Sequence, residues 1–421
     1  MEGLERWAEV LRGGTWLRGE ARRAFSRELK AFAGERRWDA AREGIWAESL
    51  DPLKLVAKLA FGLTEGVPVV LANPRWGRSE REAFEETFGR VSGGVWRMSE
   101  PELLSGGEVA IPTGGTGGSL KFAVHDRRTL GLAGQRVVEA TGGKRLHATV
   151  ALAPFHASGL MPLVRAGLSG GTVIFGRPGI EESGQSGAAV EAGIRTVSLV
   201  ATLARRYLDG DRSLLANYDL IFLGGGPTPK EVEDELRGLG LEVWNTYGMT
   251  ETGGMIACDP NGGGWARALP GVRMRLSEGG EIEVETLGLA KRYLGGARLG
   301  GWYATGDLGR MSEAGLKVEG RSRPTIITGG EKVDPGEVER VMAKLDGVIE
   351  AVVWGSEDVG WGEVVCAAVA VAGEVRAEDL RKGLENELAN YKIPKEIILV
   401  RAGLPRDERG KIDWAALGRR R

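Results

Sequence analysis

The densest set of residues that could bind an anion lies at positions 111–122, IPTGGTGGSLKF. Its glycines allow backbone N–H groups to crowd around a negative charge, its hydroxyls add donors, and Lys121 adds a cation. The spacing does not fit a Walker A loop, because no Gly-Lys-Ser/Thr follows a first glycine at the required distance. The segment predicts a phosphate-binding loop, and a flexible Gly-rich surface loop is the alternative.

Other side chains of suitable chemistry follow further along the chain. Tyr247 can stack on a base, and Thr250 and Glu251 offer a hydroxyl and a carboxylate suited to phosphate and Mg²⁺. Asp307 follows a Thr-Gly turn, where a carboxylate can accept hydrogen bonds from both ribose hydroxyls. Taken alone, Asp307 also fits a turn or cap residue, and Lys411 fits an exposed surface lysine.

Short apolar runs rich in β-branched residues must position these side chains. Such runs are typical of parallel strands buried on both faces, and ligands bind beyond the carboxyl ends of such strands. Three Gly-rich breaks, FHASGL, GGGPTP and TYGMTE, directly follow strands, which predicts that they share one rim. The five runs are residues 147–153, 172–175, 195–201, 218–223 and 241–245.

The rest of the chain predicts antiparallel strands that complete the first domain, and then a second, smaller domain. Residues 265–310 alternate in a pattern that favours antiparallel strands. After residue 320, KVDPGEVERVMAKL offers Asp334 as an N-cap, Pro335 at the first helical position and Glu337 for a capping box. We therefore expect an α/β fold, with a large N-terminal domain (residues 1–319) and a small, mobile C-terminal α+β domain (residues 320–421). The first fifty residues are predicted to be helical and carry no motif.

Composition excludes several classes of partner. The net charge of −2, from 56 basic and 58 acidic residues, argues against a nucleic-acid or anionic membrane surface. No signal peptide or apolar run long enough to span a bilayer is visible. Cys258 and Cys366 are too few for a disulfide framework, so we expect reduced thiols in a cytoplasmic protein without membrane insertion.

Five motifs in one order resemble the adenylate-forming superfamily, which includes acyl-CoA ligases, luciferases and peptide-synthetase adenylation domains. Residues 113–122 resemble the phosphate loop TSGTTGxPKG of that family, although Gly117, Leu120 and Phe122 replace its usual hydroxyl, proline and glycine. The other four are NTYGMTE (245–251), GWYATGDLGR (301–310), GRSRPTIITGGEKVDPGEVE (320–339) and PRDERGKID (405–413).

The resemblance implies a fold, three cofactors (ATP, Mg²⁺ and coenzyme A) and a role for each matching position. Lys411, His156, Thr250 and Glu251 are implied as catalytic, with Glu251 also a metal ligand. A hinge is implied near residues 320–324, where Arg323 is followed by Pro324. The implied nucleotide and CoA positions are Thr113, Gly114, Gly115, Thr116, Gly118, Lys121, Gly224, Gly225, Gly226, Tyr247, Gly248, Met249, Asp307, Arg321, Gly329 and Gly330.

A narrower resemblance concerns the acyl substrate. The PTGG opening of the phosphate loop and the FHASGL segment resemble the o-succinylbenzoate–CoA ligases of menaquinone and phylloquinone synthesis. Their substrate has two carboxylates, so the one that does not react needs a cation or donors. Arg165 is the candidate cation, and a surface arginine is the alternative. The implied substrate-binding residues are His156, Ser158, Gly159, Arg165 and Thr252.

The resemblance thus implies an AMP-forming acid–thiol ligase that acts on a small carboxylic acid and binds no nucleic acid, and it leaves a homodimer open. One rival is an aryl- or fatty-acyl-CoA ligase of other specificity. A second rival is a degenerate nucleotide-binding protein that keeps the fold without the chemistry. The altered phosphate loop favours the second rival, whereas Glu251, Asp307, Arg321 and Lys411 together argue against it.

Overall fold

The computed structural model describes residues 2–34, 37–113, 120–177, 180–181, 193–321, 325–401, 403–406, 412–414 and 416–417. The chain divides into two compact units. The first comprises Met1–Pro74, Glu85–Thr113 and Lys121–Ser322, and the second comprises Arg323–Arg421 with Arg75–Phe84. The predicted domain boundary at 319/320 and the hinge stay predictions, and Arg323 and Pro324 lie outside the described residues.

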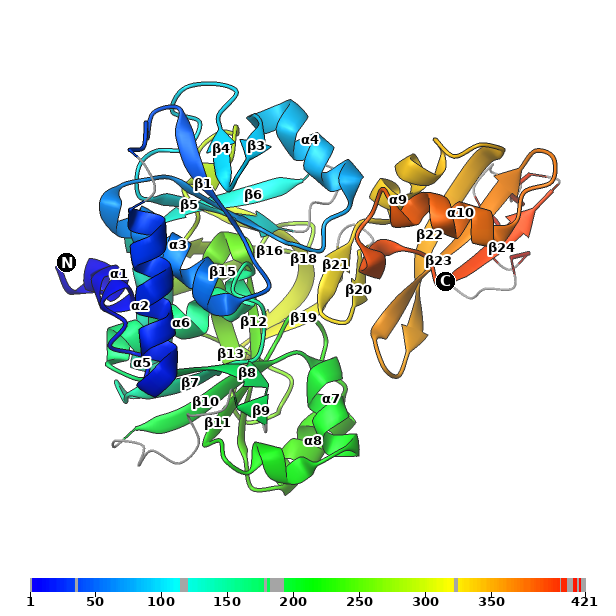
Figure 1. The fold of residues 1–421 in the computed structure, drawn as a ribbon. Helices are drawn as coiled ribbons and strands as arrows, with labels where there is room; N and C mark the ends of the chain where they lie inside the picture. Colours follow the sequence, from blue (N-terminus) through cyan, green and yellow to red (C-terminus); the bar gives the residue numbers. More distant parts are fainter. Residues whose placement is uncertain are drawn as a thin grey trace. The chain divides into compact units, whose positions relative to one another are not determined.

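The predicted parallel strands form the centre of one sheet in the first unit (Figure 1). Neighbouring strands β7, β8, β10, β11 and β12 all pair in parallel, which confirms the five apolar runs as strands. In order across the sheet the strands are β14 (Arg267–Ala268), β13 (Gly254–Asp259), β12 (Glu242–Met249), β11 (Leu220–Leu223), β10 (Ile194–Leu199), β7 (Leu146–Val150), β8 (Val173–Arg177) and β9 (Ile180–Glu181).

The predicted break at TYGMTE is wrong. The TYGMTE segment was expected to follow a strand, but β12 continues through Tyr247 and Gly248 to Met249. It continues because β12 leaves its parallel partner β11 after Asn245 and pairs antiparallel with β13 from Asn245 onward. The break therefore begins only at Thr250, with a short 3₁₀ turn over Thr250–Thr252.

Two further sheets complete the first unit. One combines parallel and antiparallel pairs, and the other is wholly antiparallel, as predicted for most of residues 265–310. The first contains β17 (Arg292–Tyr293), β6 (Lys121–Asp126), β5 (Glu108–Thr113), β2 (Val69–Ala72), β1 (Glu43–Glu48), β4 (Val95–Arg97) and β3 (Val91–Ser92). The second contains β15 (Val272–Leu276), β16 (Glu281–Thr286), β18 (Tyr303–Ser312) and β19 (Gly315–Arg321).

Local sequence explains where the helices begin and end. For α3, Asp51 caps the first turn by accepting from Leu53 N, Pro52 occupies the first helical position, and Gly66 ends the helix at φ 69°. Among the described residues, none of the helices has both the length and the apolar character that a bilayer span requires. The helices up to residue 238 are α1 (Glu2–Gly13), α2 (Gly19–Ala33), α3 (Pro52–Glu65), α4 (Arg78–Phe88), α5 (Arg127–Ala140), α6 (Ala157–Ser169), α7 (Ala201–Asp209) and α8 (Lys230–Gly238).

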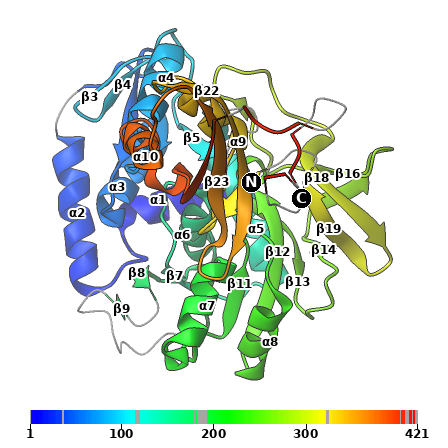
Figure 2. The same ribbon diagram turned by 90° about the vertical axis from the view of Figure 1, so that its right-hand side faces the viewer.

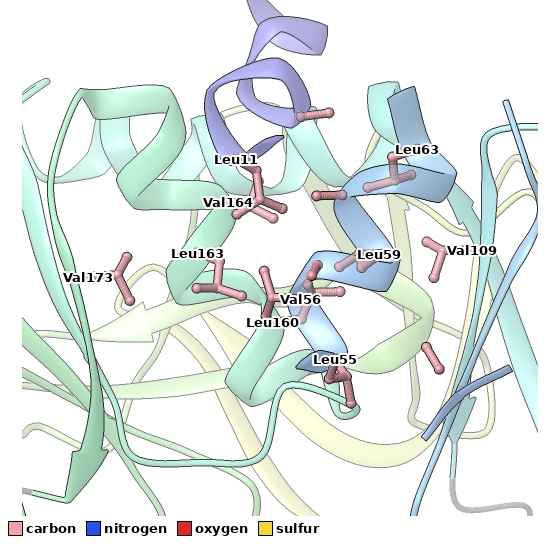
Figure 3. Close-up of a cluster of buried hydrophobic side chains, with 14 of the residues drawn as sticks. Leu11, Leu55, Val56, Leu59, Leu63, Val109, Leu160, Leu163, Val164 and Val173 are labelled. Carbon is pink, nitrogen blue, oxygen red and sulfur yellow. The ribbon is translucent and has the colours of Figure 1, made fainter. Parts of the chain in front are cut away.

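The predicted N-terminal helices help to close the main hydrophobic core. Leu11 of α1 lies against Val164 of α6, and Val56 and Leu59 of α3 face Leu160 of α6 across the same core (Figure 3). Trp7 and Trp16 are also fully buried there, and Trp7 Nε1 donates to the Arg127 carbonyl at 2.9 Å. Burying such large side chains is the main stabilising contribution of this segment.

The second unit is a smaller α+β body in which α9 and α10 cover one face of a sheet (Figure 2). Asp334 caps α9 by accepting from Gly336 N, with Pro335 first in the helix, as predicted. Glu337 instead pairs with the buried Lys392, with Nζ–Oε1 2.7 Å. The elements are β20 (Ile326–Thr328), β21 (Glu331–Val333), α9 (Pro335–Met342), β22 (Val348–Asp358), β23 (Gly362–Val371), α10 (Ala377–Glu385) and β24 (Glu396–Val400).

Candidate active site

The ends of strands β5 and β6 flank the predicted phosphate loop. Thr113 and Lys121 are register partners in this antiparallel pair. Thr113 Oγ1 donates to Glu251 Oε1 at 3.0 Å, and Lys121 Nζ lies 5.5 Å from the centre of the Tyr293 ring. Gly114, Gly115, Thr116 and Gly118 lie outside the described residues, as does Lys411, so their predicted roles stay predictions.

The other end of this strand pair is fixed by a buried carboxylate. Arg292 donates to both oxygens of Glu108, at 3.0 and 2.8 Å, and Lys291 Nζ lies 2.5 Å from Oε1. Burial alone would raise the pKa of Glu108, but the hydrogen bonds from Arg292 and Lys291 outweigh it and lower the pKa to about 2. This ion-pair cluster holds β17, and with it Tyr293, against β6.

Glu251 lies at the end of a chain of hydroxyl groups. Tyr293 OH donates to Glu251 Oε1 at 2.9 Å and lies 2.9 Å from Tyr303 OH. Burial and the negative charge of Glu251 both raise the pKa values of the two tyrosines, so both stay protonated donors. Among the described residues no lysine or arginine pairs with Glu251, which leaves its carboxylate charge available to a bound cation.

The 3₁₀ turn that carries Glu251 is held tightly in place. Thr252 Oγ1, fully buried, donates within the turn to Met249 O at 3.0 Å or Gly254 O at 2.7 Å. A Cβ atom at Gly248 would come within 2.2 Å of the Gly254 carbonyl oxygen, so only glycine allows this approach of β12 and β13. The hydroxyl of Thr252 is thus used in hydrogen bonds that stabilise the turn. Its predicted contact with substrate stays a prediction.

Tyr247, Asp307 and Arg321 meet in the structure, and their predicted roles in binding the nucleotide stay predictions. Asp307 and Arg321 face each other across β18 and β19, with Arg321 Nε 3.1 Å from Asp307 Oδ1. Tyr247 OH donates to the other oxygen, Oδ2, at 2.9 Å. A carboxylate offers about four lone-pair directions, so this buried, pre-oriented group keeps acceptor capacity for ribose hydroxyls.

The Gly224–Gly226 break follows the carboxyl end of β11, as predicted. A Cβ atom at Gly224 would lie 2.5 Å from Thr246 Oγ1, and Gly225 has φ +86°, which L side chains rarely adopt. Gly224 N donates to the Leu199 carbonyl at 3.1 Å. The break therefore passes close to β12 at the carboxyl end of β11, and its predicted contact with the nucleotide stays a prediction.

The FHASGL segment (residues 155–160) does not directly follow strand β7, as was predicted, because β7 ends at Val150 and a loop over residues 151–156 intervenes; helix α6 begins at Ala157, within the segment. His156 precedes the first residue of α6, and its ring lies 4.6 Å from that of Phe155. Ser158 is exposed, whereas Gly159 is buried against the loop, since a Cβ atom there would meet the Ala153 carbonyl at 2.3 Å. These positions fit the predicted rim, and their contacts with substrate stay predictions.

Arg165 lies on the buried side of α6, so the surface-arginine alternative is wrong. Its side chain is 3% exposed, and Nη2 donates to Ser198 Oγ of β10 at 3.0 Å. The guanidinium lies 4.7 Å from the centre of the Phe222 ring of β11, and Nη1 lies 3.7 Å from Met255 Sδ. Burial lowers the pKa of Arg165 to about 9, so it stays a cation at neutral pH. Within the described parts of the chain, no carboxylate pairs with it.

In the second unit, Gly329 and Gly330 form the turn between β20 and β21. Both have positive φ, +59° and +86°, and a Cβ atom at Gly329 would lie 2.9 Å from the Trp361 ring. Gly329 N donates to the Trp361 carbonyl at 2.8 Å. The predicted role of these two glycines in binding a cofactor stays a prediction.

Within the first unit, the structure brings predicted residues into contact in two groups: Thr113 with Glu251, and Tyr247 with Asp307 and Arg321. Arg165 instead contacts Ser198 of β10 and Phe222 of β11, which were not predicted. Sequence reasoning missed Tyr293, whose hydroxyl donates to Glu251, and Tyr303, whose hydroxyl bonds that of Tyr293. Tyr303 lies inside the recognised GWYATGD motif and could have been found there. Tyr293 and Ser198 had no local signal.

Comparison with known families defines the class of protein. Residues 108–294 match the family of AMP-binding enzymes, and residues 337–411 match the C-terminal domain of AMP-binding enzymes. The chain belongs to the AMP-binding enzymes, which confirms the resemblance to adenylate-forming enzymes.

Within that family the chain is similar to 2-succinylbenzoate–CoA ligases. A probable 2-succinylbenzoate–CoA ligase of Mycobacterium tuberculosis is 32% identical over 335 residues, covering 74% of this chain and 84% of the relative. The 2-succinylbenzoate–CoA ligase of a Geobacillus species is 33% identical over 284 residues, or 61% of this chain. The match spans 57% of the length of that Geobacillus relative.

Solved structures give the same result for the fold. A double mutant of o-succinylbenzoate CoA synthetase from Bacillus subtilis, bound to the product analogue OSB-NCoA, has a TM-score of 0.75 and 25% identity, with 94% of this chain and 92% of that chain covered. The amide bond synthetase of Marinactinospora thermotolerans has a TM-score of 0.78 at 20% identity, covering 98% of each chain, and is similar in fold alone. The predicted α/β class is confirmed.

Proposed function

We propose that the chain is an ATP- and CoA-dependent ligase that adenylates o-succinylbenzoate and transfers the acyl group to CoA. The observation that carries the substrate assignment is Arg165, a buried cation without a carboxylate partner in the described chain. The similarity to 2-succinylbenzoate–CoA ligases supports the same assignment.

The physical reason is the cost of burying a charge. Moving a guanidinium from water into the protein interior costs several kcal/mol of free energy, which is about as much as one well-placed counter-ion contributes. The Ser198 hydroxyl and the Phe222 ring repay part of this cost. A substrate with a second carboxylate would supply the missing negative charge, directly or through a water molecule, whereas a monocarboxylate would not.

In the first half-reaction, the substrate carboxylate attacks the α-phosphorus of ATP and pyrophosphate leaves. Asp307, oriented by Tyr247 and Arg321, would accept hydrogen bonds from the ribose hydroxyls. Lys121 and the Thr113 hydroxyl would flank the phosphates. These groups act by orienting ATP and by stabilising charge that grows in the transition state.

Magnesium is part of the proposal because Glu251 fits it. No group of three or more acidic, His or Cys ligands gathers in the described residues, but Mg²⁺ commonly takes one or two carboxylates and completes its shell with phosphates and water. Glu251, without a basic partner, and the Thr250 hydroxyl would hold it. When bound, the ion would neutralise phosphate charge.

In the second half-reaction, the CoA thiol attacks the acyl-adenylate and AMP leaves. The Gly329–Gly330 turn would admit the pantetheine arm. Lys411 would stabilise the first transition state and withdraw before the second, as the second unit turns about residue 323. Cytoplasmic location and a homodimer complete the proposal, and sedimentation of the purified protein tests the dimer.

The experiment is a substrate panel in which AMP release is measured with ATP, Mg²⁺ and CoA. We expect o-succinylbenzoate to be turned over far better than benzoate or a fatty acid. Preference for a monocarboxylate would leave a CoA ligase of other specificity. No AMP release with any acid, together with retained ATP binding, would favour the degenerate nucleotide-binding protein.

A further inference from the structure

Every backbone carbonyl of the Thr250–Thr252 turn is held by a donor from a different part of the chain. His125 Nε2, from β6, lies 2.9 Å from Thr250 O. Ala290 N donates to Glu251 O at 2.7 Å. Arg136, from α5, donates through Nη2 to Thr252 O. Two of these three donors are side chains, and neither belongs to a motif that the proposed function uses.

The ring of His125 is held in place by a hydrogen bond at its other nitrogen, Nδ1. A carbonyl can only accept, so Nε2 must carry the hydrogen and Nδ1 of the neutral ring is an acceptor. Thr129 Oγ1 lies 3.2 Å from Nδ1 and can supply that hydrogen. Thr129 is held in turn by the capping box with Asp126 at the start of α5. His125 is completely buried, so its ring has one orientation and one tautomer.

Arg136 is a second buried cation without a carboxylate partner in the described residues. Its side chain is 3% exposed, and Nη1 donates to Thr286 Oγ1 at 3.0 Å. Helix α5 packs against β13, directly after the turn (Figure 2). The guanidinium of Arg136 therefore places a positive charge at the Thr252 carbonyl. Thr252 is the residue that directly follows Glu251.

We infer that His125 and Arg136 are positioning residues for Glu251: they fix the backbone on both sides of it and so set the direction of its carboxylate. This inference rests on the proposed function, in which Glu251 and Thr250 hold the Mg²⁺ that accompanies ATP. Neither residue is among those proposed to bind the substrate. A loss of either contact lets the turn shift, and a displacement of about 1 Å at a reacting group can lower a rate about a hundredfold.

The test compares three variants of buried histidines. His125→Leu removes the donor to Thr250 O, and His125→Gln keeps an amide N–H that can reach the same carbonyl. His147→Leu is the matched control, because His147 is also buried and bonds a threonine hydroxyl, Thr172 Oγ1, at 2.8 Å. His147 lies on β7, which β10 and β11 separate from β12, the strand that leads into the turn. Arg136→Met and Arg136→Lys form a second pair of the same design.

Calorimetry gives the first readout, the gain in ATP affinity on adding Mg²⁺. His125→Leu should reduce this gain about tenfold or more and lower kcat for AMP formation about ten- to a hundredfold, with the KM for the acid nearly unchanged. His125→Gln should recover most of both, and His147→Leu should keep both near the wild-type values.

Equal effects of His125→Leu and His147→Leu, or loss of ATP affinity by His125→Leu to the same degree with and without Mg²⁺, would overturn the inference. Failure of the proposed function would look different. The wild-type protein would then release no AMP with o-succinylbenzoate, whereas the Mg²⁺ dependence of ATP binding would still report on His125.

Discussion

Asp307→Asn tests the nucleotide site with the least change of shape. The buried carboxylate accepts from Arg321 Nε at 3.1 Å and from Tyr247 OH at 2.9 Å. The amide keeps one acceptor, loses the charge and points N–H groups at a donor. A hydrogen bond to a charged group contributes about 1.5–3 kcal/mol, so ATP should bind about ten- to 150-fold more weakly.

The assay is calorimetric titration with ATP and with 2′-deoxy-ATP. In the wild type, removal of the 2′-hydroxyl should weaken binding, and this penalty should shrink in Asp307→Asn, because hydroxyl and carboxylate act as a pair. Asp219→Asn is the control, since Asp219 also pairs with an arginine, Arg195, but at an exposed position. An unchanged deoxy penalty in Asp307→Asn would remove Asp307 from the ribose site.

Two further predictions concern charge. Lys411→Ala should slow adenylation about 10²–10³-fold or more while leaving thioester formation from supplied acyl-adenylate nearly normal, and near-normal pyrophosphate release would refute the role. The pKa of Glu108, about 2 when folded and 4.5 ordinarily, means that the group stabilises the fold above pH 4.5 and that this contribution, about 3 kcal/mol, is lost as pH falls toward 2. Urea unfolding between pH 7 and 3 should therefore show a shallower loss of stability for Glu108→Gln, and an identical slope in both proteins would contradict this.

The sequence predicts the parallel strands well because their signal is local. Each run is short, largely apolar and rich in β-branched or aromatic residues, and a strand buried on both faces needs no other pattern. The end of β12 was not predictable in the same way. Tyr247 to Met249 remain a strand only because β13 returns to pair with them, and that pairing depends on tertiary contacts that Gly248 makes sterically feasible.

The residues of the candidate site also differ in whether the local sequence predicts them. Motif residues such as Thr113, Glu251 and Asp307 could be predicted from residue type and order. Their partners could not, because Tyr293 reaches Glu251 across 42 positions and His125 reaches Thr250 across 125. Contacts at such separations are set by packing of sheets, which leaves no spacing rule in the sequence.

The most direct test of the central claim compares two substrates in two forms of the enzyme. The kcat/KM for AMP release is measured for o-succinylbenzoate and for an analogue without the second carboxylate, in the wild type and in Arg165→Ala. If Arg165 binds that carboxylate, the wild type should prefer o-succinylbenzoate strongly, and the variant should lose about ten- to a hundredfold of this preference. An equal loss of activity toward both acids in Arg165→Ala, or no preference in the wild type, would contradict the account.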